Sequence, residues 1–180
     1  MSTEAEQQLI IQRIYLKDVS FEAPNSPVIF TQEWNPNMNL DLNTQVEFLS
    51  NDNYEVALSI TITVKSNDKT AFLVEVTQAG VFFITGYSQD QLNHLLAAYC
   101  PNVLFPYARE RLAAFVTAQQ YAEPVKSILD NLRDEIGHPH ASVSELIDAL
   151  FAFMDEDRKS TALKALQGIK IGRASCRERV

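Results

Sequence analysis

The stretch that decides the fold lies in the first half of the chain and reads Tyr54-Glu55-Val56-Ala57-Leu58-Ser59-Ile60-Thr61-Ile62-Thr63-Val64. From Val56 to Val64, apolar side chains at the even positions alternate with small or polar side chains at the odd positions. A period of two residues is typical of a β-strand, because successive side chains of a strand point to opposite sides. The stretch therefore predicts one strand of a sheet that buries one face.

A turn and a second strand follow directly. Ser66-Asn67-Asp68-Lys69 is rich in turn-forming residues, and residues 70–78 alternate again, with Phe72, Val74 and Val76 directed inward. A short turn joins antiparallel strands. These two stretches therefore predict a β-hairpin.

Two more strand signals complete the β-rich half. We expect Ala79-Gly80 to end the preceding strand and residues 81–85 to continue as another, because glycine weakens a strand interior. Residues 10–21 are rich in β-branched and aromatic side chains and predict an N-terminal strand. The turns between the last three segments predict an antiparallel meander.

A long connection, residues 23–53, separates the N-terminal strand from the others. It contains three prolines, many asparagines and the single tryptophan, so we expect an irregular crossover loop. Long ordered loops are uncommon and are often functional. Its apolar side chains either fill the core or line a groove, and the pattern favours the core; they are Val28, Ile29, Phe30, Trp34, Met38, Leu40, Leu42 and Leu49.

Helical signals begin at Ser88, which with Gln91 forms a capping pattern, and Ser142 with Glu145 forms another. We expect Cys100-Pro101-Asn102 to interrupt the first helical run. The predicted helices cover residues 88–99, 106–120, 123–136, 143–154 and 158–166. A sheet followed by helices predicts an α+β fold.

Charge excludes several classes of partner. The chain has 23 acidic and 15 basic side chains, a net charge of −8 and a pI near 4.8. Nucleic acids and anionic membrane surfaces attract a surplus of Lys and Arg, so neither is an expected partner. The polar N-terminus, the absence of an apolar run of about 18 residues and the two cysteines lead us to expect a cytoplasmic protein without membrane insertion.

No set of side chains converges on catalysis or on metal binding. His138 and His140 share one turn without an identifiable third ligand, and Asp155-Glu156-Asp157 is typical of solvated charge. Cys100 lies in an apolar helix end and is expected to be a buried structural thiol. We expect no enzyme activity, no cofactor and no metal.

The outward positions of two strands carry acidic side chains. These positions are Asp18, Ser20 and Glu22 on the N-terminal strand and Ala71, Leu73, Glu75 and Thr77 on residues 70–78. An exposed leucine beside carboxylates is a candidate docking site for a basic partner. An ordinary solvated sheet face explains the same pattern equally well.

Ordered motifs run through the first 110 residues. They are Ile11-Gln12-Arg13-Ile14-Tyr15-Leu16-Lys17-Asp18-Val19-Ser20-Phe21-Glu22-Ala23-Pro24-Asn25, Trp34-Asn35-Pro36, Leu40-Asp41-Leu42, Tyr54-Glu55-Val56, Ala71-Phe72-Leu73-Val74-Glu75-Val76 and Tyr99-Cys100-Pro101-Asn102-Val103-Leu104-Phe105-Pro106-Tyr107-Ala108-Arg109-Glu110. In order and spacing these motifs closely resemble the SecB family of bacterial protein-export chaperones over about residues 10–112.

The resemblance implies a four-stranded antiparallel sheet with a long crossover loop and a long helix, assembled into a homotetramer as a dimer of dimers. It implies an ATP-independent holdase that binds unfolded preproteins and delivers them to the SecA motor. The implied SecA-docking surface comprises Asp18, Glu22, Leu73 and Glu75. The implied substrate groove comprises Phe30, Trp34, Met38, Leu40 and Leu42, although a core role stays open for Leu40 and Leu42.

The chain departs from the family pattern after Glu110, where the stretch that leads into the family's lid helix is missing. We therefore divide it into a SecB-like domain, residues 1–112, and a helical extension, residues 113–170, which is a natural tail, a fused module or a chimeric assembly. Residues 171–180 match the in-frame translation of a common sequencing-adapter oligonucleotide at every position. We interpret them as translated adapter and exclude them from the fold.

Three functions compete at this point. The first is the export chaperone, and the second is a SecB-like chaperone dedicated to a toxin–antitoxin pair. The third is an oligomerising scaffold that carries a helical adaptor module in residues 111–170.

Overall fold

The computed structural model describes residues 6–123 and 125–155. Its elements are β1 (Gln8–Glu22), the 3-10 helix η1 (Val28–Thr31), β2 (Pro36–Ser50), β3 (Asn53–Ser66), β4 (Lys69–Thr85), α1 (Gln89–His94), the π-helical segment η2 (Leu95–Tyr99), α2 (Cys100–Gln119), α3 (Val125–Glu135) and α4 (Val143–Asp155). Of the predicted segments, residues 158–166 and 171–180 lie outside the described residues.

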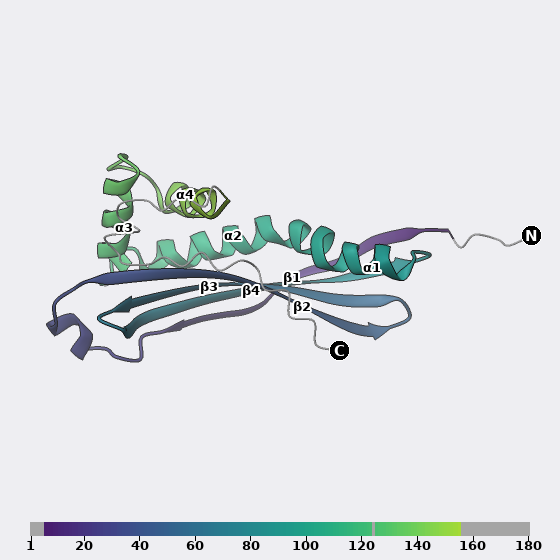
Figure 1. Cartoon of the computed structure of the whole chain (residues 1–180), viewed down its shortest axis with the longest axis horizontal. Helices are drawn as coiled ribbons and strands as arrows, with labels where there is room; N and C mark the ends of the chain where they lie inside the picture. Colours follow the sequence, from purple (N-terminus) through teal and green to yellow (C-terminus); the bar gives the residue numbers. More distant parts are fainter. Residues whose placement is uncertain (1–5, 124, 156–180) are drawn as a thin grey trace, which may run out of the picture.

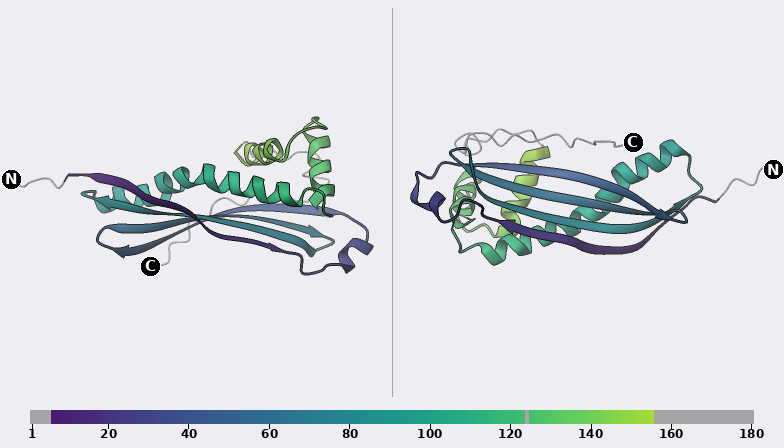
Figure 2. Two further views of the ribbon diagram at one scale, coloured as in Figure 1. Left: turned by 180° about the vertical axis from the view of Figure 1, so that it is seen from behind. Right: turned by 90° about the horizontal axis from the view of Figure 1, so that it is seen from below.

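The four strands form one antiparallel sheet in the order β1-β4-β3-β2, which confirms the expected α+β fold with a four-stranded antiparallel sheet. The β2–β3 and β3–β4 hairpins turn at Asn51-Asp52 and Asn67-Asp68, and all four residues have positive φ. Asparagine and aspartate tolerate this conformation better than other side chains. The helices lie on one face of the sheet, and the other face carries none of the described helices (Figures 1 and 2).

The expectation of an irregular crossover over residues 23–53 is wrong for its second half. Residues 36–50 form β2, which pairs with β3 along its length, so the crossover is confined to the segment that contains η1. The asparagines of β2 alternate with apolar residues and occupy the face of the sheet that is free of helices. The asparagine-rich composition of β2 is typical of loops, although its alternation with a period of two residues is typical of a strand.

The expected strand break at Ala79-Gly80 is also wrong, because β4 runs without interruption through both residues. At Gly80, both β1 and α2 lie close to the backbone of β4. A Cβ atom there would lie 2.9 Å from Cε2 of Phe82, 3.1 Å from the carbonyl oxygen of Arg13 and 3.1 Å from Cδ2 of Leu104. The glycine allows close packing of backbone and helix rather than a turn.

The expected interruption at Cys100-Pro101-Asn102 is a change of helix type rather than a break. The N–H of Cys100 donates to the carbonyl of Leu95, five residues back, so η2 is one wide π-turn. Pro101 then lies at the start of α2, and because it has no N–H to donate, it interrupts the hydrogen-bond ladder at one position without ending the helix. Helix α2 continues to Gln119.

The core lies between the sheet and the helices. Cys100, Leu104, Ala108 and Leu112 form a stripe along α2 that is almost fully buried. The inward residues of the hairpin, among them Phe72, Val74 and Val76, are buried as predicted. The described parts of α3 and α4 join the same continuous core, and both helices agree closely with their predicted ranges.

The close packing at Gly80 gives the first prediction. Gly80→Ala should lower the free energy of unfolding by about 1–3 kcal/mol, because the new methyl group overlaps a buried ring and a strand carbonyl. Urea unfolding followed by circular dichroism measures this change. Gln45→Ala, at an exposed position of β2, serves as the control and should change stability by less than about 0.5 kcal/mol. An equally stable or more stable Gly80→Ala variant would show that the reduced entropy of the unfolded chain outweighs the overlap.

Candidate functional site

The strand register brings the four predicted docking residues together on the face of the sheet without helices, which we call the open face. Glu22 of β1 lies opposite Leu73 of β4, and Ser20 lies opposite Glu75. Asp18 follows in the next outward pair, opposite Thr77. The four predicted residues therefore form one compact group across two adjacent strands.

Within this group the exposed fractions differ. Asp18 and Glu22 are exposed, whereas Leu73 and Glu75 are half-buried. Thr61 of β3 donates a hydrogen bond of 3.0 Å to a carboxylate oxygen of Glu75 and so fixes its orientation. Ala71 and Thr77, the other two predicted outward positions of this strand, are buried, and the Thr77 hydroxyl is hydrogen-bonded to that of Ser59 at 2.7 Å.

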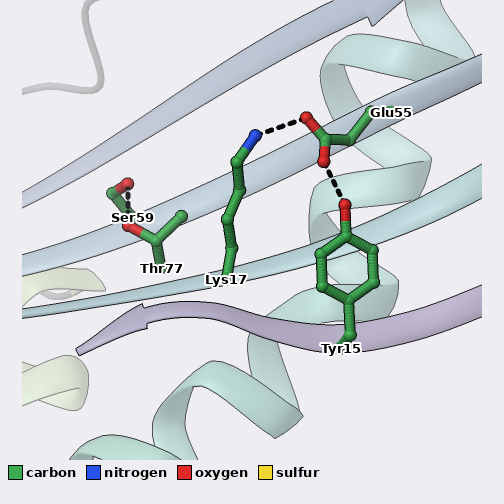
Figure 3. A network of polar contacts seen from close by, with 5 residues as sticks. All are labelled: Tyr15, Lys17, Glu55, Ser59 and Thr77. Atoms are coloured by element: carbon green, nitrogen blue, oxygen red, sulfur yellow. Dashed lines mark hydrogen bonds and ion pairs between the residues drawn. The ribbon is translucent and has the colours of Figure 1, made fainter. Parts of the chain in front are cut away.

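A polar cluster crosses the open face next to this group (Figure 3). Tyr15 and Lys17 on β1 both donate to the carboxylate of Glu55 on β3, two strands away. Tyr15 reaches over β4 at Ala79, a side chain too small to block it. The β1–β4 register shifts between Leu16 and Asp18, so Lys17 is an extra residue without a partner position on β4. Such a bulge changes the direction of the extra side chain, and Lys17 turns toward Glu55.

The cluster shifts the pKa values of two of its members. The hydrogen bond from Lys17, followed by that from Tyr15, lowers the pKa of the Glu55 carboxyl below its ordinary value. Burial, followed by the hydrogen bond and charge of Glu55 and by the charge of Glu47, raises the pKa of Tyr15 to about 12. At neutral pH the cluster therefore holds an ionised Glu55 carboxylate and a neutral Tyr15 phenol.

The predicted groove residues do not form a single exposed surface. Phe30, on η1, is exposed, and Trp34 and Leu42 are half-buried against the core. Met38 and Leu40 are 2% and 4% exposed and lie on the helix face of β2. The indole N–H of Trp34 is buried and has no hydrogen-bond acceptor among the described residues.

Two apolar regions were not identified from the sequence. One lies near the β2–β3 turn, where Val46 and Phe48 are 46% and 60% exposed and Phe48 packs edge-on against Tyr54. The alternation within β2 was a sufficient signal for this region, since both residues lie on the same face as Leu42.

The second region runs along α2. Tyr99, Val103 and Tyr107 are spaced four residues apart in one row, and the same row reaches Phe115, whose ring contacts Phe21 of β1. The row therefore faces the β1 side of the sheet. Tyr99 and Tyr107 of the row are exposed, and so are Ile11 and Leu16 of β1. Helical spacing alone does not give the side of the sheet to which such a row turns.

The described residues offer little to catalysis. In residues 6–123 and 125–155, no three His, Cys, Asp or Glu side chains are arranged to hold a metal ion. Cys100 is fully buried, as expected, and this burial raises the pKa of its thiol to about 12, so it stays protonated and unreactive.

None of the described helices is both long and apolar enough to cross a membrane.

The family comparison decides the assignment. The model of the SecB family, described as preprotein translocase subunit SecB, matches residues 2–126. The chain belongs to the SecB family. The resemblance noted in the sequence is thus confirmed, and chaperones of this family are not enzymes. The match passes the predicted boundary at residue 112 and ends at residue 126, and the origin of residues 113–170 stays a prediction.

Two solved structures are also similar to this SecB-family chain. A Mycobacterium tuberculosis SecB-like chaperone, solved in complex with a ChAD peptide from the HigA1 antitoxin, is 15% identical, with a TM-score of 0.45 over 62% of this chain and 80% of that one. A Streptococcus agalactiae protein of unknown function is 12% identical, with a TM-score of 0.28 over 66% of this chain and 92% of that one.

The Glu55 cluster gives a prediction about acid stability. The pKa of Glu55 is lowered in the folded state, so its ionised carboxylate adds to the free energy of unfolding. This stabilisation is fully present above the ordinary carboxyl pKa and is lost as the pH falls through the depressed pKa. Between about pH 6 and pH 3, the urea midpoint of Glu55→Gln should therefore fall less than that of the unmodified chain. Glu33→Gln, in the crossover, is the matched control. Parallel midpoint curves for Glu55→Gln and the unmodified chain would refute the stabilising role of the cluster.

Proposed function

We propose that this SecB-family chain is a cytoplasmic, ATP-independent holdase that binds unfolded preproteins and delivers them to the SecA motor. The observation that carries the proposal is the grouping of Asp18, Glu22, Leu73 and Glu75 on one open face. These are the positions to which the resemblance assigns SecA docking. A basic partner would gain charge complementarity from the three carboxylates and an apolar contact from Leu73.

Client binding needs apolar surface rather than catalytic groups. An unfolded chain exposes apolar segments that aggregate, and shielding them gains about 25 cal/mol per Å² before the cost of ordering both partners. Exposed apolar side chains lie on η1 and on the C-terminal half of β2, among them Phe30, Val46 and Phe48. This surface supports the holdase without requiring nucleotide or metal.

The homotetramer is part of the same proposal. Contiguous apolar surface on a soluble chain marks an interaction site. The row of Tyr99, Val103 and Tyr107, together with exposed Ile11 and Leu16, supplies such a surface for other copies of the chain. Several client sites on one assembly raise the avidity for a long unfolded chain.

The helical-adaptor alternative has weaker support. An independent module has a core of its own. The buried residues of α3 and α4, among them Leu129, Leu132 and Leu146, instead belong to the same apolar cluster as the sheet. This shared core favours the chaperone over an independent helical adaptor.

A light-scattering assay tests the holdase. The full chain, added without nucleotide in a stoichiometric amount, should suppress the aggregation of several unrelated unfolded preproteins. A chain without effect on any client would contradict the proposal. Protection of a single antitoxin, with no effect on the other clients, would favour the toxin–antitoxin alternative instead.

Charge reversal tests the docking surface. Asp18→Lys and Glu75→Lys should each weaken binding to SecA by at least about tenfold and leave aggregation suppression unchanged. Calorimetry at fixed ionic strength measures the affinity. Asp134→Lys, an equal charge change on α3, is the control and should bind normally. Equal losses of SecA binding and of holdase activity would contradict the assignment of the open face as the SecA-docking surface.

A further inference from the structure

The alternation of side chains along β1 shifts by one position at Lys17. Ile14 lies opposite Gly80, which faces α2. Val19 lies opposite the buried Val76, and both Ile14 and Val19 pack against the core. In a regular strand, two residues five positions apart point to opposite faces, as every odd separation requires. The extra residue at Lys17 therefore changes the face on which all later side chains of β1 lie.

This shift decides the face of the proposed docking residues. If β1 continued from Ile14 without the extra residue, Asp18 and Glu22 would lie with it on the helix face, and Phe21 would lie on the open face. With the bulge, Phe21 instead stacks on Phe72 of the helix face, with ring centroids 5.7 Å apart. Asp18 and Glu22 consequently lie on the open face.

Glu55 of β3 binds the bulge at two points. Its carboxylate accepts a hydrogen bond from Tyr15, which precedes the bulge, and another from Lys17, the extra residue itself (Figure 3). The side chain of Glu55 is only 13% exposed, whereas that of Lys17 is 43% exposed. A shielded carboxylate that accepts from two donors fixes their positions better than an isolated surface ion pair does.

A neighbouring charge favours the orientation of Glu55 toward β1. Glu47 lies directly opposite Glu55 in the β2–β3 pairing. Like charges at opposite positions of adjacent strands repel each other. Repulsion from β2 and attraction by Lys17 on β1 therefore act in the same direction on the Glu55 carboxylate.

We propose that Glu55 is a positioning residue for the docking surface. Through Tyr15 and Lys17 it holds the β1 bulge, and the bulge keeps the carboxylates of β1 on the same face as Leu73 and Glu75 of β4. The ion pair with Glu55 also offsets the positive charge of Lys17 beside the acidic group. The inference rests on the proposed SecA docking and adds a residue that lies outside the four predicted docking positions.

A cross-strand disulfide measures the register without SecA. Ser20 and Glu75 lie opposite each other, and opposite residues of antiparallel strands have Cα atoms about 4.5–5.5 Å apart, which suits a disulfide. The full-length variant Ser20→Cys/Glu75→Cys, with Cys176→Ser, is equilibrated with reduced and oxidised glutathione, and mass spectrometry gives the equilibrium constant of its disulfide. Adding Lys17→Glu or Glu55→Ala should lower this constant at least about fivefold. Adding Lys17→Arg, which keeps the ion pair, should lower it less than about twofold.

A second pair of cysteines on the same two strands is the control. Ile10→Cys/Phe83→Cys joins opposite residues on the N-terminal side of the bulge, and its constant should change less than about twofold in the same backgrounds. Cys100 is fully buried and does not exchange. If Lys17→Glu and Glu55→Ala left the constant of the first pair unchanged, the positioning role would be overturned. Equal losses in both pairs would also overturn it, because they would show a general loosening of β1.

Binding to SecA, measured by calorimetry, gives the functional test. Lys17→Glu removes an ammonium group and adds a carboxylate, so charge complementarity alone predicts tighter binding of a basic partner. The positioning role predicts the reverse, a loss of affinity of at least about fivefold that Lys17→Arg does not show. Lys65→Glu, the same charge change at an exposed position of β3 on the open face, is the control and should bind at least as tightly as the unmodified chain.

The outcomes separate this inference from the docking function. Tighter binding of Lys17→Glu than of the unmodified chain would overturn the positioning role while leaving the docking surface intact. Failure of the unmodified chain to bind SecA would overturn the docking function instead. The disulfide constants decide in either case whether Glu55 holds the bulge.

Discussion

The close approach of α2 to the centre of the sheet is the constraint on which the rest of the structure depends. Leu104 of α2 packs directly over Gly80, where a Cβ atom would overlap the ring of Phe82 and the carbonyl of Arg13. The stripe that contains Leu104 fixes which face of the sheet is buried. Every strand then divides its side chains between that face and the open face.

This division separates two tasks that conflict chemically. Apolar groups of the helix face serve client binding and assembly in the proposed function, whereas carboxylates of the open face serve docking. Because successive strand residues point to opposite sides, Leu73 and Glu75 lie on one face and Phe72 and Val74 on the other. The Tyr15–Glu55 contact stiffens the open face by linking β1 to β3 across β4.

The sequence predicted elements best where a local period was long and uniform. The alternation from Val56 to Val64 gave β3, and the capping pairs at Ser88 and Ser142 gave the starts of α1 and α4. Strand β2 was missed although its alternation is regular, because its asparagines are typical of loops. The sequence predicted a strand break at Gly80. The position instead requires glycine because α2, which is distant in the sequence, packs against it.

The sequence by itself determined the strand and helix periods, the acidic character of the chain and the membership of the SecB family. Only the tertiary structure decided which exposed residues lie together. The register put Glu22 beside Leu73, and the packing of α3–α4 put Met38 beneath these two helices. Local periodicity fixes the face of an element on which a side chain lies, but long-range packing fixes what that face meets.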